Sequence, residues 1–232
     1  MSAHIFDGFF FGIYPYIALS VLILGSILRY DCAPYSWRSG SSQLLRRRQL
    51  IAGSVLFHAG VLVVFIGHLV GLLTPIRVFE FIDISHGAKQ IMAIVVGGVA
   101  GALAFLGATL LLHRRLFDPR IRRTSSFGDI AILVLLWLQL ALGLGTIPVS
   151  AQHLDGGEML RFMAWAQGIF TFRTDAWTLV QDAHWVFKAH LILGLTIFLV
   201  FPFTRLVHML SAPLRYLWRR GWQIVRTRHA LG

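Results

Sequence analysis

The stretch from Leu56 to Pro75, with the sequence LFHAGVLVVFIGHLVGLLTP, restricts the possible folds of this chain more than any other segment. Residues 50–73 contain no Asp, Glu, Lys or Arg. At about 1.5 Å of rise per residue, a helix over these residues is long enough to cross a hydrocarbon core of about 30 Å. The segment therefore predicts a helix that spans a membrane.

Two histidines, His58 and His68, lie inside this apolar segment, roughly 15 Å apart along an ideal helix. An ionisable side chain within a membrane is costly and indicates a functional site. One such histidine alone would more simply be a neutral imidazole hydrogen-bonded to a neighbouring helix, but two at different depths need two partners. The last apolar segment supplies them, with His190 near its start and His208 near its end. Because imidazole is a good iron ligand, the four side chains predict two haems, each bound by two histidines.

The composition agrees with an integral membrane protein. Of 232 residues, 56% are hydrophobic and only 13% are charged, and the mean hydropathy is +0.71. The net charge of +11 does not indicate a nucleic-acid partner, because the Lys and Arg residues gather between apolar segments. A single cysteine, Cys32, excludes an internal disulfide and a CxxCH site for covalent haem, so the haems are expected to be of the b type.

The apolar segments predict an all-α bundle of five transmembrane helices in a single domain over residues 1–232. The first segment follows no basic region and is expected to be kept as a span, not removed as a signal. Between the fourth and fifth spans, residues 158–170 have the periodicity of a surface helix, with Trp165, Trp177 and Trp185 suited to the membrane interface. The predicted spans are about 9–28, 50–73, 91–112, 129–149 and 185–208, followed by a basic tail over 209–232.

Positive charges gather in alternate connections between these spans. Residues 29–49, 113–127 and 209–232 each hold five arginines, whereas 74–90 and 149–184 each hold only two positive side chains. By the positive-inside rule, the N-terminus is outside and the C-terminus is cytoplasmic.

The order of the spans predicts which histidines pair. The second and fifth spans run antiparallel, so His58 is expected beside His208 at the cytoplasmic depth, and His68 beside His190 at the outer depth. The separations along the two helices do not match. The eighteen residues from His190 to His208 would span about 27 Å of ideal helix, whereas the ten residues from His58 to His68 would span roughly 15 Å. Helix tilt, or a kink at Pro202 within a helix that keeps both histidines on one face, would have to absorb the difference.

Several further features have a packing interpretation beside a functional one. Glycines at 53, 60 and 67 and small residues at 93, 97 and 101 would let a helix, or for the former set a porphyrin, approach closely. Arginines near the cytoplasmic ends are candidate partners of haem propionates, although membrane topology explains each of them equally well: Arg29, Arg114, Arg115 and Arg205. The remaining six histidines are not expected to bind iron: His4, His86, His113, His153, His184 and His229.

Short motifs along nearly the whole chain resemble a known family, the gamma subunits of membrane-bound respiratory nitrate reductase, which are dihaem cytochromes b. The matching stretches are IYPYIA at 13–18, LRYD at 28–31, SSQ at 41–43, FHAG at 57–60, FIGH at 65–68, LTP at 73–75, KQ at 89–90, RRLF at 114–117, TIP at 146–148, SAQH at 150–153, WAQ at 165–167 and FPFTRLVH at 201–208.

This resemblance implies a fold, cofactors and a substrate site. The family has five transmembrane helices and two b-type haems, a distal one on His68 and His190 near the outer surface and a proximal one on His58 and His208. It also implies that Lys89, together with Gly67 and His68, binds a quinol, either menaquinol or ubiquinol. Electrons would pass from the quinol through the distal and then the proximal haem, with protons released outside.

The resemblance further implies a multi-pass protein of the inner (cytoplasmic) membrane, in contact with lipid, and two cytoplasmic partners. These would be an iron–sulfur subunit and a catalytic molybdenum subunit, because this chain has neither a pterin-binding domain nor a cysteine cluster and so holds no catalytic residue for nitrate reduction. Three alternatives stay open: a cytochrome b subunit for another terminal reductase, a passive membrane anchor without haem, and an ion transporter that uses the histidines as a relay.

Overall fold

A computed structural model describes residues 2–37 and 45–210 of the chain. Every regular element in these ranges is helical, and five helices are long and apolar enough to span a membrane, as the sequence predicts. Arg38, the SSQ motif, His229 and the basic tail from residue 211 lie outside the described residues. The spanning elements are α1 (Ser2–Gly8), η1 (Phe9–Ile13) and α2 (Tyr14–Cys32), which form the first span, then α3 (Arg47–Leu73), α5 (His86–Phe117), α7 (Phe127–Ser150) and α9 (Trp185–Val200).

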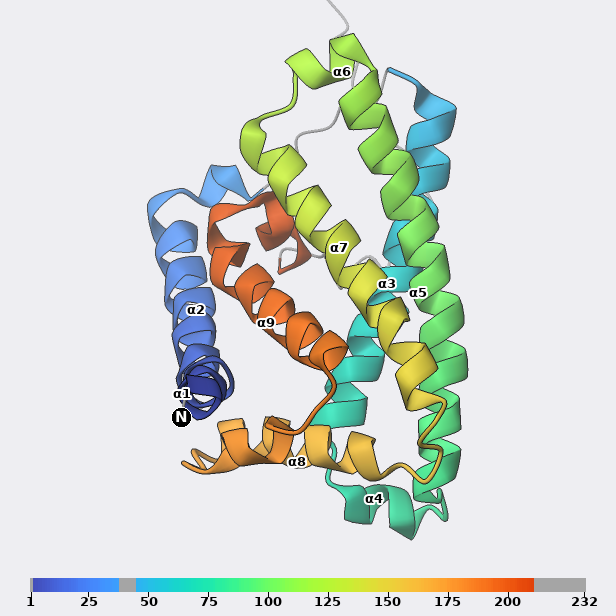
Figure 1. Cartoon of the computed structure of the whole chain (residues 1–232). Coiled ribbons are helices and arrows are strands. Elements are labelled where there is room, and N and C mark those ends of the chain that lie inside the picture. The colour runs from blue at the N-terminus through green and yellow to red at the C-terminus, as the bar shows by residue number, and fades with distance from the viewer. Residues whose placement is uncertain (1, 38–44, 211–232) are drawn as a thin grey trace, which may run out of the picture.

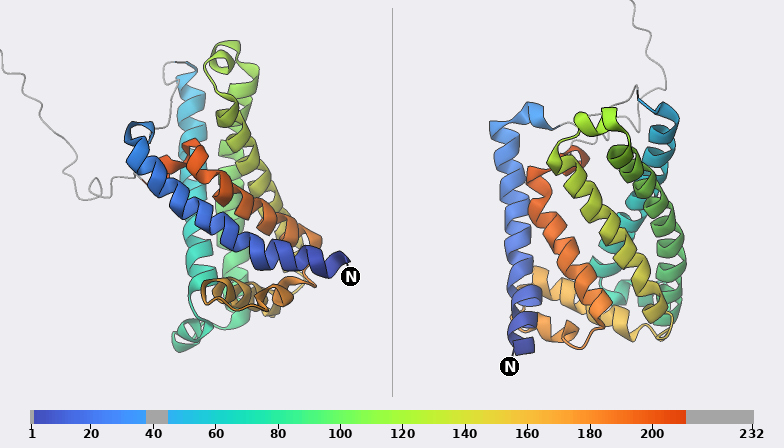
Figure 2. Two further views of the ribbon diagram at one scale, coloured as in Figure 1. Left: turned by 90° about the vertical axis from the view of Figure 1, so that its left-hand side faces the viewer. Right: turned by 45° about the horizontal axis from the view of Figure 1, so that its top comes forward.

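The five long helices pack in the order α2, α9, α7, α5, α3. Helix α2 lies at one edge, and α3 crosses behind α7 (Figure 1). The arginine-rich connections lie at one end, with η2 (Pro34–Ser36) and α6 (Pro119–Arg123). At the other end lie α4 (Ile76–Phe81), α8 (Gly157–Phe170), η3 (Ala176–Val180) and the N-terminus (Figures 1 and 2). The predicted helix over residues 158–170 is α8, which crosses this second end.

Small residues let α3 and α5 approach closely, and one of them, Gly60, is among the glycines that the spacing singles out. A Cβ at Gly60 would lie 2.4 Å from the Ala100 carbonyl oxygen, and one at Gly107 would lie 2.3 Å from the Phe57 nitrogen. By contrast, a Cβ at Gly97 would meet nothing within 4 Å. Gly101, in contrast, is buried, and a Cβ there would lie 3.2 Å from Leu144 of α7. The expected close approach of a helix along residues 93, 97 and 101 is therefore found at Gly101 and not at Gly97.

The first span contains a π-helical turn, η1, followed at once by Pro15. In a regular α-helix the carbonyl of Phe11 would accept a hydrogen bond from the N–H of residue 15, which proline lacks. The indole Nε1 of Trp165, on α8, donates to this carbonyl at 2.9 Å. Trp165 is only 6% exposed, so its indole faces the protein interior, and its expected depth at the membrane interface stays a prediction. The indole is buried because it supplies the donor that Pro15 removes.

The last predicted span does not continue as a helix to His208. Helix α9 ends at Val200 and is followed by the 3-10 turn η4 (Phe201–Phe203), by Thr204 in an extended conformation and by a second 3-10 turn, η5 (Arg205–Met209). The sequence predicts a kink at Pro202, and the structure has a break there instead. His190 and His208 therefore do not share the face of one helix, and the mismatch between the two histidine separations disappears.

The break is held by the guanidinium of Arg29, near the end of α2. Its Nη1 donates to the carbonyls of Pro202 at 2.6 Å and Thr204 at 2.7 Å, while Nε and Nη2 donate to the hydroxyl and the carbonyl of Ser36, each at 3.0 Å. Carbonyls at the end of a helix need donors from outside it, and a positive charge there is favourable. Arg29 therefore fixes the turn that carries His208.

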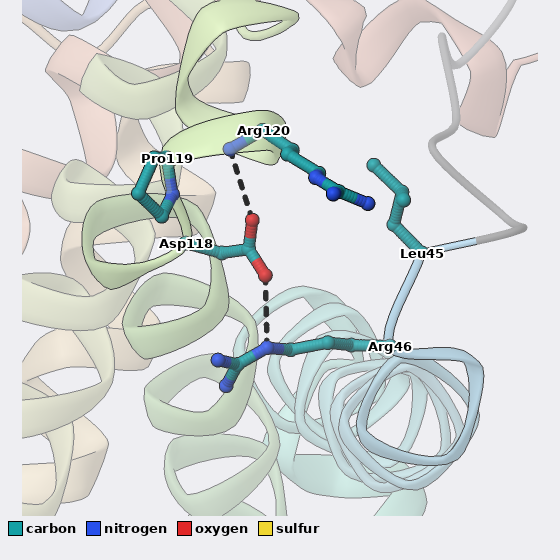
Figure 3. Close-up of a pocket in the computed structure, with 5 residues that line it drawn as sticks. All are labelled: Leu45, Arg46, Asp118, Pro119 and Arg120. Atoms are coloured by element: carbon teal, nitrogen blue, oxygen red, sulfur yellow. Dashed lines mark hydrogen bonds and ion pairs between the residues drawn. The ribbon is translucent and has the colours of Figure 1, made fainter.

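A carboxylate ties α3 to α6 at the arginine-rich end. Asp118 accepts from the Arg120 backbone N–H at 3.0 Å and pairs with Arg46 at 2.8 Å beside a shallow hollow, which is also lined by Leu45 and Pro119 (Figure 3). Partial desolvation alone would raise the pKa of Asp118, but the backbone N–H groups of Ile121 and Arg120 and the Arg46 guanidinium hold it below its ordinary value. The carboxylate is therefore ionised at neutral pH.

Replacing Trp165 with phenylalanine should destabilise the chain, because the buried Phe11 carbonyl would lose its donor. An unpaired buried polar group costs about 1–3 kcal/mol. Thermal unfolding of purified protein in detergent measures the effect, with W185F as the control, since Trp185 is exposed. An equal change in both variants would contradict the role of the Trp165 indole.

Replacing Arg29 should lower the unfolding temperature more than replacing the exposed Arg47. Hydrogen bonds from a charged donor contribute about 1.5–3 kcal/mol each, so R29A should have a large effect. R29K should recover little, because one ammonium does not reproduce the planar fork that serves both Pro202 and Ser36. Unfolding of R29A at the temperature of R47A would show that Arg29 does not hold the break.

Candidate functional site

The four histidines singled out from the sequence lie in two pairs. The ring centres of His58 and His208 are 6.3 Å apart, and those of His68 and His190 are 6.1 Å apart. In each pair, one ring comes from α3 and the other from the segment formed by α9 and η5. Because α3 lies at one end of the helix order and does not pack along α9, the two rings of each pair face each other across the bundle.

These separations fit a metal ion between two imidazoles. A histidine nitrogen binds a transition metal at about 2 Å and lies about 1 Å from its ring centre, so two rings on opposite sides of one ion have centres roughly 6 Å apart. Rings in direct hydrogen-bond or stacking contact would be closer. No group of three or more His, Cys, Asp or Glu side chains able to hold a metal occurs among residues 2–37 and 45–210, so a two-ligand metal centre is the arrangement that these rings support.

Hydrogen bonds orient three of the four imidazoles. Nδ1 of His58 lies 2.7 Å from the Ser54 carbonyl oxygen, and Nδ1 of His68 lies 2.8 Å from that of Val64, each four residues earlier on the same helix. Nδ1 of His208 is bonded in the same way to the Arg205 carbonyl. A carbonyl acceptor fixes the proton on Nδ1 and leaves Nε2 as the basic nitrogen, which is the usual arrangement of a metal-binding histidine.

His190 is held differently, by a side chain from another helix. The amide Nε2 of Gln139, on α7, donates to the His190 carbonyl oxygen at 3.1 Å and lies 3.3 Å from the imidazole Nε2. Nδ1 of His190 and Oε1 of Gln139 are both buried without a hydrogen-bond partner. The sequence analysis missed Gln139, and the available signal was a lone carboxamide inside an otherwise apolar helix.

Lys89 is buried where three elements meet. Its ammonium donates to the Gly71 carbonyl at 3.0 Å and to the Met163 sulfur at 2.9 Å, and it lies 3.7 Å from the centre of the Phe79 ring. The side chain is only 2% exposed. The simpler interpretation, a lysine extending into water at the end of a span, is therefore wrong. Gly71 is one helical turn beyond Gly67, which places Lys89 against the same end of α3 as His68.

The glycines of α3 divide into two groups. Gly53 and Gly60 are buried against α5, so their role is helix packing. Gly67 is exposed, and a Cβ there would meet nothing within 4 Å. The space beside His68 is thus open in the isolated chain.

The arginines considered as propionate partners are all engaged within the chain. Arg29 binds the carbonyls of the break after α9, and Arg114 donates to the Leu45 carbonyl at 2.6 Å. Arg205 and Arg115 approach Asp129 at 2.7 and 3.8 Å. Their role as propionate partners stays a prediction.

Of the other histidines, those in the described ranges lie outside the two ring pairs. His86 is 3.1 Å from Glu80, His113 is 3.3 Å from the Gln49 amide, and His153 is 3.3 Å from the Val149 carbonyl. His4 packs edge-on against Trp177, and His184 accepts from the Val186 N–H.

Comparison with known proteins finds similarity over nearly the whole length of this chain. The family model described as nitrate reductase gamma subunit matches residues 7–228. The respiratory nitrate reductase 1 gamma chain of Escherichia coli (strain K12) is 50% identical over 222 residues, which cover 95% of this chain and 97% of that protein. The nitrate reductase gamma chain of Bacillus subtilis (strain 168) is 41% identical, over 94% and 96%. The nitrate reductase-like protein NarX of Mycobacterium tuberculosis is 31% identical over 96% of this chain but only 34% of its own length.

Proposed function

Because this chain belongs to the nitrate reductase gamma subunit family, we propose that it carries electrons from a membrane quinol to partner subunits through two b-type haems. As a gamma subunit, it is a membrane component of a respiratory nitrate reductase complex. The observation that carries the proposal is the pair of imidazole separations, 6.3 and 6.1 Å, each of which suits one iron. The single domain over residues 1–232 is part of the same proposal.

The four histidines hold the two haems, His58 with His208 and His68 with His190. The haems supply one-electron redox chemistry, which no side chain of the protein provides. The protein orients three of the imidazoles through the Ser54, Val64 and Arg205 carbonyls. With two imidazoles of the protein committed to each iron, the haems would serve electron transfer instead of reaction at the metal.

Lys89, Gly67 and His68 form the quinol site in this proposal. An ammonium has three N–H groups, and Gly71 and Met163 account for two of those of Lys89. The ammonium also lies 3.7 Å from the centre of the Phe79 ring, so a quinol oxygen that accepts the third N–H would replace this contact. The open space at Gly67 leaves room for a flat ring beside His68.

The arginine-rich end faces the cytoplasm in this proposal, and the end with α4, α8 and Lys89 faces outward. Quinol protons are then released outside, while electrons leave at the arginine-rich end toward an iron–sulfur subunit and a molybdenum subunit. Moving one charge across the membrane corresponds to about 2.3 kcal/mol per 100 mV, so this arrangement would build membrane potential.

A pyridine haemochrome assay on purified protein should give two haems per chain. H58A and H208A should each lose the same haem, and H68A and H190A should each lose the other. The double variant H58A/H208A should therefore keep one haem, whereas H58A/H190A should keep none.

H113A is the matched control and should keep both haems. Colourless wild-type protein would favour a passive anchor, and ion flux in vesicles made with it would favour a transporter. Loss of both haems in H58A/H208A would contradict the pairing.

K89A should lower quinol oxidation about tenfold or more while both haems remain, because it removes a charged hydrogen bond of about 1.5–3 kcal/mol to the substrate. Steady-state kinetics of the complete complex with a quinol analogue measures this effect. R77A, at an exposed position in the same connection, should behave as wild type. Unchanged quinol kinetics in K89A would remove Lys89 from the site.

A further inference from the structure

Helices α7 and α9 interlock at one point, where each places a polar side chain over a glycine of the other. A Cβ at Gly194 of α9 would lie 3.1 Å from the Gln139 amide nitrogen, and a Cβ at Gly143 of α7 would lie 3.1 Å from His190 Cε1. Gln139 and Gly143 are one turn apart on α7, as His190 and Gly194 are on α9. The two helices are thus shaped to bring this amide against this imidazole.

The contact distinguishes His190 from the other three histidines. Those three are oriented by carbonyls within their own segments, whereas His190 is held by the carboxamide of Gln139, which donates to its main chain and lies against its ring. A polar group within a membrane is costly unless it has a partner. Gln139 therefore has a reason to be there that helix packing alone does not give.

We propose that Gln139 is a positioning residue for His190, which sets the orientation of that imidazole at the outer of the two haems. The inference rests on the proposed function, since it assumes that His190 binds iron. Groups in contact with metal-binding histidines fix ring orientation and ligand basicity. Because Gln139 touches neither His58 nor His208, its influence should be confined to one haem.

The test is a potentiometric titration of the haem absorbance in membranes that contain the full complex. H190A identifies the distal haem by its loss. In Q139M, which keeps the length of the side chain without its hydrogen bonds, the ratio of oxidised to reduced distal haem at a fixed potential should change about tenfold, equal to 59 mV. The midpoint should rise, because an imidazole that is no longer held in place would donate less to the iron, and ferric iron depends on this donation more than ferrous iron. The reduced distal haem should also begin to bind carbon monoxide, while the proximal haem stays unchanged.

Q49M is the matched control. The Gln49 amide donates to the Leu110 carbonyl at 3.1 Å and lies 3.3 Å from Nδ1 of His113, so it repeats the same contacts at a histidine outside both pairs. Both midpoints in Q49M should equal those of wild type. If Q139M does not accumulate, G143A replaces it, because the added methyl presses on the His190 ring and should shift the same haem only.

The measured midpoints and haem contents distinguish a failure of the role of Gln139 from a failure of the proposed function. Two unchanged midpoints in Q139M, or equal shifts of both haems, would overturn the role of Gln139 while the proposed function stands. Wild-type protein without two b-type haems, or H190A that keeps both, would instead overturn the proposed function itself.

Discussion

A backbone carbonyl that loses its helical partner inside a membrane has to find another donor within the protein. This requirement governs both places where a spanning segment departs from a regular helix. At Pro15 the donor is the indole of Trp165, and at Pro202 it is the guanidinium of Arg29. The second case positions the candidate site, because the break after Val200 brings His208 back toward α3. Without it, an ideal helix would place His208 about 27 Å from His190.

The same requirement applies to the imidazoles. A buried ring with an unpaired nitrogen is unfavourable, and three of the four candidate ligands meet this need with a nearby carbonyl. The fourth, His190, depends on a neighbouring helix. Lys89 is another case, since its buried ammonium is stabilised by a carbonyl, a thioether and an aromatic ring. His190 and Lys89 therefore depend on other elements for their partners, whereas the other three histidines find theirs within their own segments.

Much of this architecture could be predicted from the sequence, because apolar length and alternate arginine-rich connections are local properties. The five spans follow from them, and so does the pairing of His58 with His208 and of His68 with His190. The break at Pro202 could not be predicted, since a proline is compatible with a kink and the outcome depends on Arg29, 173 residues away. Gln139 was missed for a similar reason: its partner is 51 residues away. The burial of Trp165 likewise depends on a carbonyl 154 residues earlier.

The bond between Arg29 and Thr204 has a consequence for biogenesis. The two residues are 175 positions apart, so the turn that they stabilise forms only after nearly the entire polypeptide has left the ribosome. Earlier spans can enter the bilayer one after another, but the turn bearing His208 is completed last. In the proposed function, haem binding at that position would therefore be a late event of maturation, and a nascent chain that ends before this turn would present only His58 there.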